Sequence, residues 1–172
     1  MLALTTVSDY LANTIEPYGT SMFVKKLFLP RLFDHIIDQI YQSIEHNTNS
    51  WDKTDIPSEY DKFKMYNWMP ANDIIQDWCR SYISPDLYWG VQVINSDLPM
   101  HKDYGTEIKF NYLIDTGGDQ SITNYYDDQG KLLDSYVLKS HTWYILDVST
   151  NHSVSNIEKN RSRISLTSRI NP

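Results

Sequence analysis

The pattern of the chain changes at about Tyr88, and this change limits the possible folds more than any other sequence feature. Before it, apolar residues recur every three or four positions; after it, short β-branched and aromatic runs alternate with turn-forming residues. Six of these runs are predicted to be strands, at residues 88–95, 108–114, 121–126, 135–138, 142–148 and 163–170. Short, closely spaced strands bury their apolar faces in a sandwich or a barrel, with helices packed outside.

Two helices are predicted ahead of these strands. Apolar residues form one stripe over residues 32–46, which indicates an amphipathic helix. A second helix is predicted over residues 72–81, with Ala71 or Asn72 as its cap. Residues 22–29 alternate like a short strand that leads into the first helix.

The segment 47–70 is polar and aromatic without a sustained period, and it is predicted to be a long loop. Long loops in compact domains are often functional, so this loop is a candidate lid or substrate wall, and residues 104–107 are expected to shape specificity too. The length of 172 residues fits a single domain over 1–172, with a helical part at 1–87 and a β core at 88–172.

Charge and composition narrow the choice of partners. The formal net charge of -7 disfavours nucleic acid, because a negative protein repels phosphate. No apolar run is long enough to cross a membrane, and the first seven residues are too short and uncharged for a secretory signal. Cys79 is the only cysteine and lies in an apolar-periodic stretch, which predicts a buried structural thiol. We therefore expect a soluble cytoplasmic protein.

Three residues form a candidate metal site. His101 and Asp103 are two apart, so on a strand both side chains would leave the same face. Such a pair arises easily by chance, but His152 follows the predicted strand 142–148 and could return to the same mouth of a barrel. Two imidazoles and one carboxylate leave three coordination positions open, as in non-haem Fe(II) oxygenases. Zinc could use the same ligands, so they do not decide the metal.

Arg163 and Ser165 add a second feature, eleven and thirteen residues after His152. At this spacing on a strand the two side chains face the same way. A guanidinium beside a hydroxyl suits a carboxylate held at a fixed distance from a metal. Arg161 is the competing arginine, but only Arg163 begins the alternating strand and has the serine partner.

The ordered set of His101-Lys102-Asp103, His152 and Arg163-Ile164-Ser165 resembles the 2-oxoglutarate and Fe(II)-dependent oxygenase superfamily. The resemblance covers roughly residues 88–170, and residues 28–33 are similar to the start of prolyl-hydroxylase-like members; a prolyl-hydroxylase-like or aspartyl/asparaginyl-hydroxylase-like member is suspected. It implies a mainly β protein with N-terminal helices (α+β), whose core is a double-stranded β-helix, also called a jelly roll or cupin-like fold.

The resemblance also implies roles for individual residues. His101, Asp103 and His152 would bind Fe(II), while Arg163 and Ser165 would hold the far carboxylate of 2-oxoglutarate. Tyr112 occupies the place of a tyrosine that touches this carboxylate in several members; packing in the core is its other interpretation.

Two further assignments concern the remaining histidines. His141 competes with His152 as the distal ligand, but it lies too far from either arginine along the chain. His35 and His46 fall on or near the first predicted helix and are expected at the surface.

The implied activity is that of a dioxygenase that uses O2 and 2-oxoglutarate to hydroxylate a C–H bond. Its substrate would be a small molecule or a peptide: an amino acid, a protein side chain or a small metabolite. The presence of Asp103 argues against halogenation, because related halogenases lack this carboxylate. Two alternatives stay open: a non-catalytic cupin-like ligand-binding domain, and a zinc-dependent hydrolase or isomerase with the same triad.

Overall fold

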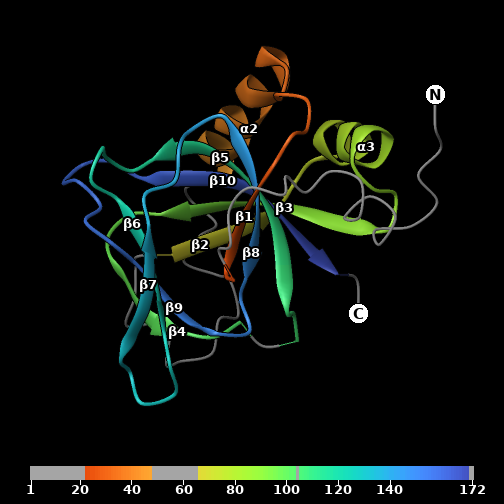
Figure 1. Cartoon of the computed structure of the whole chain (residues 1–172). Helices are drawn as coiled ribbons and strands as arrows, with labels where there is room; N and C mark the ends of the chain where they lie inside the picture. Colours follow the sequence, from red (N-terminus) through yellow and green to blue (C-terminus); the bar gives the residue numbers. More distant parts are fainter. Residues whose placement is uncertain (1–21, 48–65, 104, 171–172) are drawn as a thin grey trace.

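The computed structural model describes residues 22–47, 66–103 and 105–170. In this part of the chain two helices, a six-stranded sheet and a four-stranded sheet form three layers, with the helices outside the larger sheet (Figure 1). The helices are α2 (Asp34–Asn47) and α3 (Asp73–Tyr82).

The larger sheet has the strand order β1-β8-β5-β10-β3-β2, and the smaller sheet has the order β4-β9-β6-β7. The strands of the larger sheet are β1 (Val24–Leu27), β2 (Tyr66–Pro70), β3 (Leu87–Ile94), β5 (Ile108–Thr116), β8 (Thr142–Asp147) and β10 (Arg163–Ile170). The smaller sheet contains β4 (Leu98–His101), β6 (Ile122–Tyr126), β7 (Leu132–Tyr136) and β9 (Asn151–Ser155).

From β3 onward the chain passes repeatedly between the two sheets. The strands β3, β5, β8 and β10 lie in the larger sheet, β4, β6, β7 and β9 lie in the smaller one, and the strand pairs are antiparallel. Two facing four-stranded sheets connected in this way make a jelly roll. β1 and β2 extend the larger sheet on either side. The predicted β-rich, cupin-like jelly roll with N-terminal helices is confirmed.

Strand alternation gives the larger sheet two different faces. Side chains on one face join the helices in the main apolar cluster, including Trp89, Tyr112 and Trp143 on the strands and Ile40 and Ile75 on the helices. Residues one position along each strand point between the sheets. A second apolar cluster, built around Leu113, Tyr125 and Leu146 among others, fills one part of that space.

The helices form as their sequence patterns predict. The buried positions of α2 include Ile36, Ile37 and Ile40, spaced to form one stripe. Asn72 caps α3, because its side-chain oxygen accepts a hydrogen bond from the backbone N–H of Ile75 at 3.0 Å. Neither of these helices is both long and apolar enough to span a bilayer.

Four strands differ from the sequence-based expectations. β7 occupies Leu132–Tyr136 instead of the predicted residues 135–138. β2 occupies residues 66–70, which were expected to belong to the long loop; residues 48–65 of that loop lie outside the described part of the chain. β4 is short, contains Pro99 and has irregular pairing, so its sequence looks like a turn. β9 is mostly polar and follows a turn directly, so it has no apolar alternation to reveal it.

The side chain of Gln76 forms hydrogen bonds with the backbone of β3, just beyond the residues that pair with β2. Its amide donates to the carbonyl of Trp89 at 2.6 Å and accepts from the N–H of Trp89 at 3.2 Å. The side chain is buried, so it fastens α3 to the sheet through backbone groups that water does not reach.

We expect Gln76→Ala to lower the free energy of unfolding by about 1–3 kcal/mol, because it leaves the buried N–H of Trp89 without this acceptor. Chemical denaturation would measure the loss. Gln42→Ala, on an exposed position of α2, is the matched control and should change stability little. Equal losses in both variants would contradict this role of Gln76.

Candidate metal centre

A row of polar side chains points between the two sheets, where an ordinary core would be apolar. Gln92 on β3, Lys109 and Asn111 on β5, and Arg163 on β10 all line one pocket. On the same three strands the alternate positions that face the helices carry mostly large apolar residues. Buried polar groups are costly unless they are paired, so this row marks a functional site.

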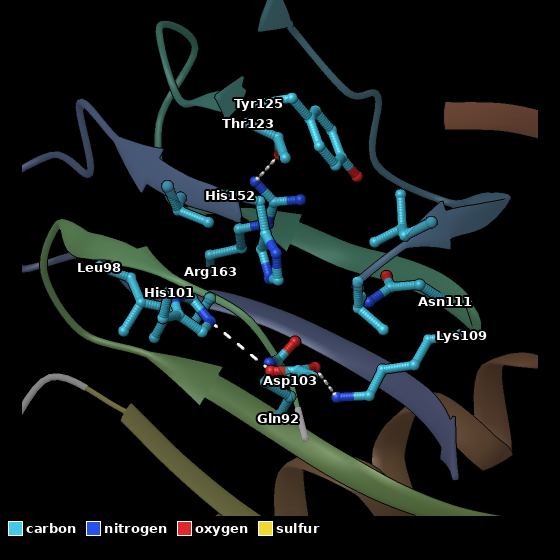
Figure 2. A pocket seen from close by; sticks show the side chains of 14 residues that line it. Gln92, Leu98, His101, Asp103, Lys109, Asn111, Thr123, Tyr125, His152 and Arg163 are labelled. Carbon is cyan, nitrogen blue, oxygen red and sulfur yellow. Dashed lines mark hydrogen bonds and ion pairs between the residues drawn. The ribbon is translucent and has the colours of Figure 1, made fainter. Parts of the chain in front are cut away.

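His101, Asp103 and His152 lie together at this pocket, and their ligand atoms are all within 4.8 Å of one another (Figure 2). His101 is the last residue of β4, and its Cα partner across the ladder is His152 on β9. Asp103 was expected on the same strand as His101, but it lies just beyond β4, where its N–H donates to the carbonyl of Val148 at 2.9 Å.

The two imidazoles are oriented in a way that fits a metal. Nδ1 of His101 lies 2.8 Å from the carbonyl of Pro99, and Nδ1 of His152 lies 2.9 Å from the carbonyl of Thr150. A carbonyl can only accept, so each Nδ1 carries a proton, and in the neutral ring Nε2 then keeps its lone pair for a metal. Metal-binding histidines are commonly held by such a contact. Nε2 of His101 is 3.7 Å from Oδ1 of Asp103, so both atoms are placed to ligate one ion with a small adjustment.

Burial and charge favour the protonation states that a metal requires. Burial, with a smaller contribution from the neighbouring His101, lowers the pKa of His152 to about 4, so the imidazole is neutral at pH 7. Burial alone would raise the pKa of Asp103, but the ammonium of Lys109, together with the two histidines, outweighs it and brings the pKa below its usual value. His152 is therefore neutral and Asp103 is ionised, the states in which each can bind a metal.

Arg163 lies in the same pocket and is only 5% exposed to solvent. Its NH1 donates to the hydroxyl of Thr123 at 2.9 Å, and no carboxylate among residues 22–47, 66–103 and 105–170 forms a salt bridge with it. Burial lowers the pKa of Arg163 to about 10, which still leaves the guanidinium charged at pH 7. A buried cation without an anion is costly, so this group indicates an anionic ligand.

Ser165 does not line the pocket itself, but its hydroxyl contacts two side chains that do. Its hydroxyl donates to Oε1 of Gln92 at 3.1 Å and accepts from Nδ2 of Asn111 at 3.3 Å. Both amides line the pocket. Oδ1 of Asn111 and the hydroxyl of Thr167, its Cα partner across the ladder, are buried and have no hydrogen-bond partner in the described structure. Such atoms are usually satisfied by ordered water or a ligand.

The structure does not bring every predicted residue to the site. Tyr112 is fully buried among the side chains beneath the helices, with its ring 4.9 Å from that of Trp143. The reason is strand alternation: on β5 the pocket side belongs to Lys109 and Asn111, so Tyr112 points to the opposite face. The interpretation of Tyr112 as a core residue is the one that the structure supports.

The competing residues also lie elsewhere. Arg161 is half-exposed and pairs with Asp115 at 3.0 Å, so its charge is neutralised outside the pocket. His141 lies in the turn before β8, where its N–H donates to the carbonyl of Leu113. His35 and His46 are exposed on α2, as expected. Cys79 is buried and free, in agreement with its predicted structural role, and burial raises the pKa of its thiol.

Lys109 and Asn111 were missed by the sequence reasoning. Both interrupt the apolar run of β5 at alternate positions, which places their side chains on the inner face of the sheet. A lysine in a buried strand is rare unless it is paired, so its position was an available signal.

No family model and no curated protein matches the chain. Among solved structures, the non-heme monooxygenase ThoJ–Ni complex has a TM-score of 0.45 at 12% identity, covering 81% of this chain and 70% of that one. Fe(II)-HppE with the alternative substrate (S)-1-HPP has a TM-score of 0.44 at 10% identity, covering 63% and 51%. A cupin-2 domain protein from Shewanella frigidimarina has a TM-score of 0.41 at 7% identity, covering 70% and 96%. The chain thus spans about half the length of the HppE chain, and the assignment of the site rests on the geometry above.

Acid should destabilise the metal-free protein through His152. The unfolded chain binds a proton there below pH 6.5, whereas the folded protein excludes it until about pH 4, so stability falls as pH is lowered through this window. The shift corresponds to a loss of about 3 kcal/mol. Unfolding measured with a chelator from pH 7 to 4 should show this slope, and His152→Gln should flatten it. The same slope in both proteins would contradict the assignment.

Proposed function

We propose that the protein is a 2-oxoglutarate- and Fe(II)-dependent dioxygenase that hydroxylates a C–H bond of a small molecule or a peptide. The observation that carries the proposal is the buried guanidinium of Arg163, which lines the same pocket as the triad and has no carboxylate partner in the described residues. A metal centre beside an unpaired arginine suits a ligand with one metal-binding end and one free carboxylate.

The residues of the chain divide this task between them. The Nε2 atoms of His101 and His152 and one oxygen of Asp103 would hold Fe(II) and leave three positions for other ligands. Arg163 would pair with the far carboxylate of 2-oxoglutarate, with Thr123 fixing the guanidinium from behind. Bound together, iron and 2-oxoglutarate supply the oxidising power for C–H hydroxylation with O2.

The remaining pocket residues orient ligands and exclude water. Ser165 would serve the carboxylate site through Gln92 and Asn111, whose amides it connects. Apolar side chains close the walls: Ile94, Leu98, Leu146 and Val154 from the two sheets, and Val148 just after β8. Apolar walls exclude water from the pocket. They therefore strengthen the pairing of Arg163 with an anion, because water no longer screens the charges.

Removing the guanidinium tests the proposal. We expect Arg163→Gln to weaken 2-oxoglutarate binding at least about 100-fold, since a charge-assisted bidentate pair is lost. Anaerobic titration of the Fe(II)-loaded protein with 2-oxoglutarate, followed by its visible charge-transfer band, would measure the affinity. Arg161→Gln is the matched control, because that guanidinium pairs with Asp115 and Glu158 outside the pocket.

Turnover distinguishes the alternatives. The proposal expects oxygen-dependent release of succinate from 2-oxoglutarate by the wild-type protein, and its loss in Arg163→Gln. A protein that binds 2-oxoglutarate but releases no succinate with any tested amino acid or peptide would instead be a ligand-binding domain. Activity with zinc that is indifferent to oxygen would identify a hydrolase or isomerase.

A further inference from the structure

Lys109 is the second buried cation of the pocket, and unlike Arg163 it has a carboxylate partner. Its side chain is 8% exposed, and its ammonium contacts Oδ2 of Asp103. Oδ1 of the same carboxylate faces Nε2 of His101 instead. The two oxygens of Asp103 therefore have different neighbours, the ammonium of Lys109 on one side and the imidazole of His101 on the other (Figure 2).

We propose that Lys109 is a positioning residue that restricts Asp103 to one ligating oxygen and thereby keeps a coordination position free at the metal. The proposal rests on the metal-binding part of the proposed function and is independent of 2-oxoglutarate. A carboxylate can bind an ion through one oxygen or through both, and the second mode occupies two positions. A charge-assisted hydrogen bond to Oδ2 opposes the second mode.

The surroundings of Lys109 hold it in this role. It lies on β5 opposite Leu146 of β8, and its ammonium is largely shielded from solvent. Among the described acidic groups only Asp103 forms a salt bridge with it. Withdrawing the ammonium from this carboxylate would leave a buried charge unpaired, which is strongly unfavourable.

The positive charge of Lys109 also lowers the affinity of the site for a metal ion. An ammonium that contacts a metal-binding carboxylate repels a divalent cation at the triad, and the repulsion is strong where water is excluded. Lys109 therefore weakens the metal site while it preserves an open position. A residue that only filled space would do neither, and this difference makes the proposal testable.

The test is Mn(II) binding to the metal-free protein, without 2-oxoglutarate. We expect Lys109→Met to bind Mn(II) at least about tenfold more tightly, because the repelling charge is gone. Water-proton relaxation of the loaded protein should report about one fewer metal-bound water, because Asp103 becomes free to use both oxygens. Lys109→Arg, which keeps the charge and the donor, should restore wild-type affinity and water content.

Lys102→Met is the matched control. Lys102 lies between the two ligands in sequence, but its ammonium pairs with Asp128 at the surface, so its loss should alter neither readout. If Lys109→Met does not fold, Lys109→Gln retains a polar group in the pocket and carries the same expected gain in affinity. Unchanged affinity and water content in a folded Lys109 variant would overturn the proposal alone. A wild-type protein that binds no Mn(II) or Fe(II) would overturn the metal centre as well.

Discussion

The pairing of Asp103 with Lys109 is the interaction on which the interior of this protein depends. The side chain of Asp103 loses much of its hydration in the pocket, and a nearby cation, the ammonium or a bound metal ion, compensates for that loss and keeps it ionised. The lysine comes from the larger sheet and the carboxylate from the loop after β4, so one ion pair connects the parts that make the pocket. Arg163 adds a further buried charge nearby, which no carboxylate of the described residues neutralises.

The jelly roll explains how candidate metal ligands distant in sequence meet. His101 and His152 are neighbours because β4 and β9 pair in the smaller sheet, while Arg163 begins β10 in the opposite sheet. Neither sheet contains the whole pocket. Apolar side chains on the outer face of the larger sheet bind it to the helices, which frees its inner face to carry polar groups. Alternate residues of the same strands thus either pack against the helices or line the pocket.

Much of this arrangement could be predicted from the sequence, because it depends on local pattern. The helices and the long strands have clear periods, and the ordered His-x-Asp, distal His and Arg motif identified the residues that now lie around the pocket. β4 and β9 could not be predicted, since a four-residue strand with a proline and a polar strand after a turn lack any period. Tyr112 was assigned by analogy, whereas alternation on β5 would have selected Asn111.

The irregular pairing of β4 has a consequence for local order. Its ladder with β9 joins only Leu98 to Val154 and His101 to His152, so few backbone bonds fasten the strand that carries one ligand and leads directly to another. An ion held by His101, Asp103 and His152 would cross-link β4 to β9, where few backbone hydrogen bonds join the smaller sheet. Amide hydrogen exchange in β4 would then slow on loading far more than in β10, which is paired on both sides.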